Sequence, residues 1–251
     1  MQTNNKIIKN LPNVVTSLNL LSGSIAIVLA FENNDLLFAA YFIILAAIFD
    51  FLDGMVARAL GAFSDLGKNL DSLADVVSFG LAPSVIIFKM LIMSLTYTDV
   101  SFNFETASFG HLIILFSAFL IAVFGAIRLA RFNIDTDQKY EFRGLAIPAN
   151  ALFFAGLAIL LLETGSENIQ AFILNTWFLE GLIVIFSALM VSRITMFSLK
   201  FETLKFNENS IRYLFLILAV LLLLFFGAKA LVAIIPVYVI FSLLRKRESK
   251  A

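Results

Sequence analysis

The chain contains no cysteine and only one histidine among its 251 residues. The lack of cysteine excludes disulfides and thiolate metal sites, and it leaves the redox compartment unreadable from the sequence. Eighteen lysines and arginines balance eighteen aspartates and glutamates, so the formal net charge of zero gives no general attraction for nucleic acid. Only 14% of the residues are charged. The function of these few charges therefore depends on where they lie.

Apolar residues make up 61% of the chain, and the mean hydropathy is +0.96, far above that of an ordinary soluble domain. Apolar runs long enough to cross about 30 Å of hydrocarbon as helices occur at residues 14–32, 36–58, 71–96, 108–131, 146–163, 177–199, 211–226 and 229–244. We expect an all-α fold, a polytopic transmembrane helical bundle with about eight transmembrane helices, or six as the alternative. The last two runs are short and predict either a tight hairpin or one bent element.

The chain is expected to form a single membrane-embedded domain over residues 1–251, with a catalytic core at about 12–200 and accessory helices at about 211–244. Residues 1–13 lack the apolar core and cleavage site of a signal peptide, so we expect them to be retained. Cations alternate with apolar residues from Lys6 to Pro12. This pattern predicts a short N-terminal interfacial helix, with an unstructured tail as the alternative.

The distribution of lysine and arginine predicts the orientation, because cytoplasmic loops are enriched in positive charge. The cations that fall on one side of the predicted spans are Lys6, Lys9, Arg58, Lys68, Arg128, Arg131, Lys139, Arg143, Arg193, Lys200, Lys205, Arg212, Arg245, Lys246, Arg247 and Lys250. The opposite loops contain none, and only Lys89 and Lys229 depart from the pattern. Both termini are therefore expected to face the cytoplasm.

Four aspartates interrupt the apolar sequence near the cytoplasmic ends of the second and third predicted spans. Asp50 and Asp53 are three residues apart, and Asp71 and Asp75 are four apart, so each pair occupies one helix face. Four carboxylates in one small volume repel one another unless they are protonated or neutralised by a cation. An oxygen-only ligand set suits Mg²⁺ or Mn²⁺ and argues against structural zinc. The cluster therefore predicts a metal site suited to phosphoryl chemistry.

Small residues and one arginine accompany the cluster. Gly54 and Gly67 leave room for a ligand to approach the helix backbone, although small residues also serve close helix packing in membranes, and Ala57 has the same two interpretations. Arg58 is placed either to hold a phosphate or to extend to the lipid headgroups. The position of the cluster at the helix ends favours a lipid substrate whose phosphates meet the metal at the interface.

The eight fixed positions of this stretch resemble the signature of the CDP-alcohol phosphatidyltransferases: Asp50, Asp53, Gly54, Ala57, Arg58, Gly67, Asp71 and Asp75. The resemblance implies enzymes that displace CMP from a CDP-linked lipid with an alcohol, and it implies a homodimer. It assigns the metal chiefly to Asp50, Asp53 and Asp71, with Asp75 as the catalytic base or as a further metal ligand. The CDP-lipid contacts that it implies are Asn13, Thr16, Gly54, Ala57, Arg58 and Gly67.

The flanking segments resemble the phosphatidylserine synthase branch of that family. They are the segment from Leu11 to Asn19, the Ser-Phe-Gly that starts at Ser78, residues 128–133 and residues 142–148, with the departure that Ala146 stands where this branch has proline. The resemblance implies CDP-diacylglycerol and L-serine as substrates. Arg128 and Arg131, three apart on one predicted helix, suit the serine carboxylate, with positive-inside anchoring as the alternative. Ser78 is a further candidate for contact with the amino acid.

Alternatives remain open from the residues alone. The same arginines suit glycerol 3-phosphate or an inositol phosphate, so the acceptor alcohol is not settled. A membrane transporter or proton relay also places carboxylates inside the bilayer, although here all four aspartates crowd one end of two helices. The favoured interpretation is a metal-dependent phosphatidyltransferase in a bacterial cytoplasmic membrane, with its active site facing the cytoplasm.

Overall fold

The computed structural model describes residues 2–32, 35–134, 142–197 and 206–244. Helices dominate these ranges, and the strands are the short antiparallel pair β1 (Phe142–Arg143) and β2 (Thr195–Met196). The helical elements are α1 (Gln2–Phe31), α2 (Leu36–Leu60), α3 (Asp65–Asp75), the π-helical turn η1 (Val76–Leu81), α4 (Ala82–Thr98), the 3₁₀ turn η2 (Phe104–Thr106), α5 (Phe109–Ser117), α6 (Leu120–Ile134), α7 (Ile147–Glu163), α8 (Glu167–Ile173), α9 (Thr176–Val191), α10 (Phe206–Phe226), the 3₁₀ turn η3 (Gly227–Ala230) and α11 (Leu231–Leu244). The predicted all-α class is confirmed.

Five helical runs are long and apolar enough to cross a membrane, which makes this an integral membrane protein. The runs are Asn10–Phe31, Leu36–Leu60, Asp65–Thr98, Phe109–Ile134 and Asn209–Leu244. A sixth arises if α8 and α9, which meet at a 55° bend, count as one span. The expected number of about eight is therefore not confirmed. One reason is that α7 has only 17 residues, and another is that only η3 separates α10 from α11.

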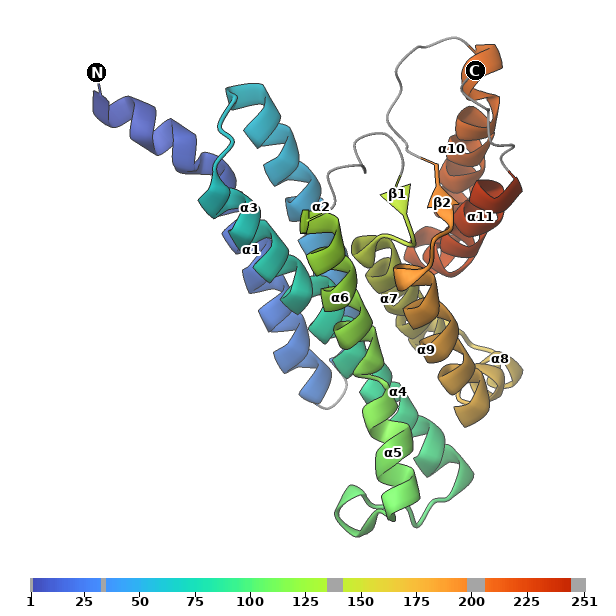
Figure 1. The fold of residues 1–251 in the computed structure, drawn as a ribbon. Helices are drawn as coiled ribbons and strands as arrows, with labels where there is room; N and C mark the ends of the chain where they lie inside the picture. Colours follow the sequence, from blue (N-terminus) through green and yellow to red (C-terminus); the bar gives the residue numbers. More distant parts are fainter. Residues whose placement is uncertain (1, 33–34, 135–141, 198–205, 245–251) are drawn as a thin grey trace.

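The last two helices form a hairpin, one of the two arrangements that the sequence left open. The ring of Phe215 on α10 lies 5.7 Å from that of Tyr238 and 6.4 Å from that of Phe241, both on α11. Such contacts need antiparallel helices, and α10 and α11 lie side by side in Figure 1. Gly227 has a φ of +59°, a left-handed conformation that side chains disfavour, so glycine permits the reversal here.

The helix that holds the second aspartate pair begins earlier than the apolar run predicts. Ser64 caps α3, and its Oγ accepts a hydrogen bond of 3.0 Å from the N–H of Gly67. At the other end of the connection, Gly61 has a φ of +58° and terminates α2. The predicted start at residue 71 was wrong because the first turn and a half of α3 is polar. The earlier start leaves only four residues between α2 and α3, which holds the two helices close together.

The N-terminal turns belong to α1, which contains Pro12 within the helix. Figure 1 shows that they bend away from the axis of the rest of α1, and the part that qualifies as a membrane span begins at Asn10. Proline favours such a bend because it removes one helical hydrogen bond. The predicted helix is present in this region, and its position at a membrane surface stays a prediction. At the other end, the span predicted at residues 177–199 was too long, since α9 ends at Val191 and β2 follows, and residues 198–199 lie outside the described ranges.

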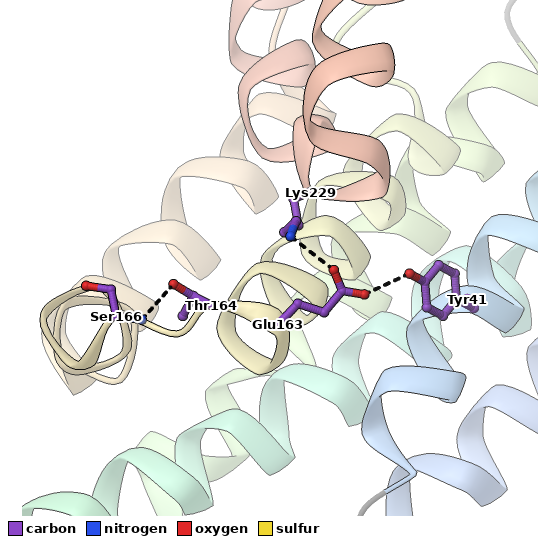
Figure 2. Close-up of polar contacts among 5 residues, drawn as sticks. All are labelled: Tyr41, Glu163, Thr164, Ser166 and Lys229. Carbon is purple, nitrogen blue, oxygen red and sulfur yellow. Dashed lines mark hydrogen bonds and ion pairs between the residues drawn. The ribbon is translucent and has the colours of Figure 1, made fainter.

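Two lysines that broke the positive-inside pattern have local partners. Lys229 Nζ lies 3.2 Å from Glu163 Oε2, and the hydroxyl of Tyr41 donates a 3.0 Å hydrogen bond to Glu163 Oε1. Figure 2 shows these three side chains joining α2, the end of α7 and η3. Lys89 donates to the carbonyl of Phe31. Both ammonium groups are thus engaged at the ends of helices opposite the aspartate cluster.

Candidate active site

The four aspartates gather where α2 and α3 lie together. One oxygen each from Asp50, Asp53 and Asp71 lie within 4.8 Å of one another. Asp75, at the last position of α3, lies close enough to interact electrostatically with all three. Asp53 and Asp75 are buried, whereas Asp50 and Asp71 are half-buried. The opposed helix faces therefore bring the carboxylates together, as their spacing predicts, and the role of each side chain remains a prediction.

This donor set fits a divalent cation. It offers three closely spaced carboxylate oxygens and no nitrogen or sulfur ligand, which is the preference of a hard ion such as Mg²⁺ or Mn²⁺. Uncompensated carboxylates at this spacing repel one another strongly where water is scarce. The cluster can hold a metal, and oxygen ligands alone do not fix which of the two ions it is.

Helix α1 supplies one hydrogen-bond donor to each helix of the aspartate cluster. Thr16 Oγ1 donates a 2.6 Å hydrogen bond to Asp53 Oδ2, and Asn19 Nδ2 donates one of 3.4 Å to Asp75 Oδ1. Thr16 and Asn19 are three residues apart and so share the face of α1 that meets α2 and α3. Sequence reasoning placed Thr16 at the lipid cleft and gave Asn19 no role. The only available signal for Asn19 was its place in the segment from Leu11 to Asn19.

A cleft of about 530 Å³ opens beside the cluster between α1, α2 and α3. Five of the six residues predicted to contact the CDP-lipid line it, together with Asp53 and Asp71: Asn13, Thr16, Gly54, Ala57 and Gly67. The sixth, Arg58, lies next to it, because its Nη1 is 3.5 Å from the position of a β-carbon built on Gly54. The structure therefore groups all six at one opening with the aspartates at its edge.

The two glycines of the cleft differ in what surrounds them. A β-carbon on Gly67 would lie 2.9 Å from Asn13 Oδ1 and 3.1 Å from Ser64 Oγ, so a larger residue there requires the Asn13 side chain to move. A β-carbon on Gly54 would meet only the arginine side chain, at ordinary contact distance. Gly67 thus leaves room for the Asn13 side chain, whereas the space at Gly54 is left for a ligand or for Arg58.

The π-helical turn η1 follows Asp75 directly and carries Ser78. Ser78 is fully buried, and its Oγ donates a 2.9 Å hydrogen bond to the backbone carbonyl of Asn19. A β-carbon on Gly23 would come within 2.5 Å of the Ser78 α-carbon, so α1 and η1 approach each other very closely. The contact of Ser78 with the acceptor stays a prediction, and in this structure its hydroxyl is used to join η1 to α1.

Arg128 and Arg131, at the end of α6, line a second cavity of about 410 Å³ between α6, β1 and the end of α9. Arg128 is only 9% exposed and lies close enough to Asp75 for electrostatic attraction. Arg131 is exposed and donates to the carbonyl of Val191 at 3.5 Å. Arg143 and Arg193 line the same cavity. Sequence reasoning counted both among the positive-inside residues and placed Arg143 in a segment that resembles the phosphatidylserine synthase branch, but it assigned neither to the site. The pairing of β1 with β2 that brings Arg143 to the cavity leaves no recognisable pattern in the sequence.

Comparisons with known proteins agree with this geometry. The sequence model of the CDP-alcohol phosphatidyltransferase family matches residues 9–189, a range that contains all four aspartates together with Arg128 and Arg131. The chain is 36% identical over 243 residues to CDP-diacylglycerol–serine O-phosphatidyltransferase of Helicobacter pylori strain J99, which covers 93% of this chain and 90% of the relative.

Two archaeal relatives are similar over a shorter range. The protein of the same name from Methanocaldococcus jannaschii is 40% identical over 147 residues, 59% of each chain. Archaetidylserine synthase of Methanothermobacter thermautotrophicus is 38% identical over 144 residues, 57% of this chain and 54% of the relative. The family match covers well over half of the sequence and the Helicobacter relative nearly all of it, and on this evidence the chain belongs to the CDP-alcohol phosphatidyltransferase family.

Proposed function

We propose that this protein transfers the phosphatidyl group of CDP-diacylglycerol to the hydroxyl of L-serine, giving phosphatidylserine and CMP. The observation that carries the proposal is the aspartate cluster at the edge of the cleft that Asn13, Thr16 and Gly54 line. Relatives named for the serine reaction support the choice of acceptor, including the Helicobacter protein that aligns over 93% of this chain.

The donor is proposed to lie with its diphosphate against the cluster and its nucleotide in the cleft. Asn13 and Thr16 approach it from α1, and Gly54, Ala57 and Gly67 leave room beside the helix backbones. Arg58 lies over Gly54, where its guanidinium can hold a phosphate oxygen. A Mn²⁺ or Mg²⁺ ion held by Asp50, Asp53 and Asp71 would offset the charge of the diphosphate.

Asp75 is proposed to be the base. It accepts the proton of the serine hydroxyl while the hydroxyl oxygen forms a bond to the phosphorus of the phosphatidyl group. The bond from that phosphorus to the CMP oxygen breaks, and CMP leaves with the negative charge. The attraction between Asp75 and the buried Arg128 supports this assignment, because a nearby guanidinium group favours the charged form of a carboxylate.

Arg128 and Arg131 are proposed to hold the serine carboxylate, since guanidinium groups bind carboxylates through paired hydrogen bonds. The cavity that they line lies at the end of α6 and shares no lining residue with the donor cleft. Donor and acceptor would then approach the base from two directions. This arrangement keeps the water-soluble acceptor apart from the lipid until both reach Asp75.

We also propose that the active site and both termini face the cytoplasm, in a bacterial cytoplasmic membrane, and that the protein is a homodimer. The distribution of lysine and arginine supports the orientation. Bacterial relatives such as the Helicobacter protein support the choice of membrane. The dimer rests on the family resemblance alone, and the molecular mass of the purified protein in detergent tests it.

Release of CMP by the purified protein in detergent tests the proposed reaction. With CDP-diacylglycerol and Mn²⁺ or Mg²⁺, L-serine should stimulate release, while glycerol 3-phosphate and inositol should stimulate it much less. Chelation of the metal should stop the reaction. Equal use of all three acceptors would contradict the choice of serine, and activity that survives chelation would contradict the metal assignment.

A further inference from the structure

We infer that Asn19 recognises the ammonium group of the acceptor and also positions the Asp75 carboxylate. The inference deepens the proposed function and rests on it. It starts from an unsatisfied atom: Asn19 is fully buried, and its Oδ1 has no hydrogen-bond partner among the described residues. Leaving a buried amide oxygen without a partner costs about 1–3 kcal/mol. Such an atom is therefore a good candidate for a group that a substrate satisfies.

The amide nitrogen of Asn19 explains how the side chain is oriented. Asn19 Nδ2 donates to Asp75 Oδ1 at 3.4 Å, so the amide oxygen has to point away from that carboxylate oxygen. The backbone of Asn19 is fixed as well, because its carbonyl accepts the Ser78 hydroxyl at 2.9 Å. Two hydrogen bonds from neighbouring elements thus hold Asn19 with its free acceptor beside the proposed base.

A second unpartnered polar atom lies near Asp75. Arg128 is 9% exposed, its Nε has no hydrogen-bond partner among the described residues, and its guanidinium interacts electrostatically with Asp75. The base is therefore flanked by one free acceptor, Asn19 Oδ1, and one free donor, Arg128 Nε. The two come from α1 and α6, which are separate elements of the fold.

A zwitterionic amino acid fits this combination of groups. Its ammonium group only donates hydrogen bonds and its carboxylate only accepts them. With the hydroxyl at Asp75, the ammonium group meets Asn19 Oδ1 and the carboxylate meets Arg128. An asparagine suits this position better than an aspartate, because it accepts from the ammonium group without adding a fifth negative charge to the cluster.

The alternative is that Asn19 only supports the fold, with an internal water on its free oxygen. The two explanations differ in what they predict for acceptors without an ammonium group. 3-Hydroxypropionate has the hydroxyl and the carboxylate of serine and lacks the amine. Recognition by Asn19 matters for serine and not for this analogue, whereas a structural role affects both equally.

The test compares kcat/KM for the two acceptors in the wild type and in Asn19→Leu, which keeps the branched skeleton of the side chain and removes both polar atoms. Loss of the Asn19 Nδ2 hydrogen bond to Asp75 should slow both reactions. Loss of the Asn19 Oδ1 atom should lower the preference for serine over 3-hydroxypropionate by about tenfold or more, the size expected for a hydrogen bond to a charged group. Ser22→Ala is the matched control, because Ser22 is buried one turn further along α1 and bonds only the carbonyl of Leu18.

An unchanged preference, with both reactions slowed equally, would overturn the inference and leave Asn19 as a structural residue. If Asn19→Leu does not fold, Asn19→Ala gives the same comparison. CMP release by the wild type distinguishes a failure of the Asn19 assignment from a failure of the proposed function. If serine does not stimulate CMP release from the wild type, the proposed function fails. If serine does so and the variant keeps its preference, only the role of Asn19 fails.

Discussion

The hydroxyl of Thr16 donates a 2.6 Å hydrogen bond to Oδ2 of Asp53, across the contact between α1 and α2. Both side chains are buried, and Asp53 offers an oxygen to the proposed metal site. The same hydroxyl lies 3.0 Å from the carbonyl of Pro12, but it has a single proton, and the shorter contact to a carboxylate is the stronger one. Thr16 therefore fixes the orientation of a proposed metal ligand from a helix that supplies none of the four aspartates.

Replacing Thr16 by valine should weaken the metal site without changing its ligands. Valine keeps the branched shape and loses the hydroxyl, so Asp53 is free to rotate. We expect the Mn²⁺ concentration for half-maximal activity to rise by about 10–100-fold, the usual cost of losing a hydrogen bond to a metal ligand. Thr16→Ser keeps the hydroxyl and should restore most of the affinity. If valine leaves the metal requirement unchanged, the hydrogen bond does not support the metal site.

Asp75→Asn should stop transfer and spare donor binding. The amide cannot accept the proton of serine, which should lower kcat by about 100-fold or more. The cleft residues that we assign to the CDP-lipid, such as Asn13 and Gly54, are untouched. CMP release measures turnover, and displacement of a labelled CDP-lipid measures binding. Normal turnover in this variant would remove Asp75 from the role of base.

Alanine at the two cleft glycines should give different results. At Gly67, the new β-carbon would lie 2.9 Å from Asn13 Oδ1, so the Asn13 side chain has to turn away, and the melting temperature should fall slightly. At Gly54, the nearest atom is 3.5 Å away, so stability should be unchanged. If the space at Gly54 receives the donor, KM for CDP-diacylglycerol should rise in Gly54→Ala. Melting temperature and KM for CDP-diacylglycerol, measured for both variants, distinguish an effect on packing from an effect on access of the ligand.

The convergence of the aspartates could be predicted from the sequence because helical spacing alone decides which residues share a face. Asp71 and Asp75 fall on one face whether α3 begins at residue 65 or at residue 71. The start itself could not be predicted from hydropathy, since Ser64 begins α3 through a hydrogen bond to the N–H of Gly67 and not through apolar residues.

The remainder of the site depends on contacts between distant segments. Asn19 meets Asp75 across 56 positions, and Arg143 reaches the second cavity only because β1 pairs with β2. One sequence contains no record of such pairings. The number of spans is not confirmed for a related reason, because hydropathy does not determine whether α10, η3 and α11 form one crossing or two.

The contact of Lys229 with Glu163 makes the C-terminal hairpin testable separately from catalysis. Tyr41, Glu163 and Lys229 join three elements at helix ends away from the aspartates (Figure 2). Lys229→Gln removes the ion pair, whose two side chains are each 33% exposed, so the loss should be about 1 kcal/mol or less. We expect a small fall in melting temperature and an unchanged KM for serine. A large change in KM would show that the hairpin influences the acceptor site.

The absence of cysteine makes the proposed orientation directly measurable, because one introduced cysteine is the only thiol in the protein. Phe63, between α2 and α3, is 75% exposed, and Val100, after α4, is 89% exposed. The connection between α2 and α3 and the end of α4 lie at opposite ends of the bundle in Figure 1. If the aspartate cluster faces the cytoplasm, a membrane-impermeant maleimide should label Val100→Cys in intact spheroplasts and label Phe63→Cys only after lysis. Labelling of Phe63→Cys before lysis would place the active site on the outer face, against the positive-inside distribution, since Arg58 and Lys68 flank that connection.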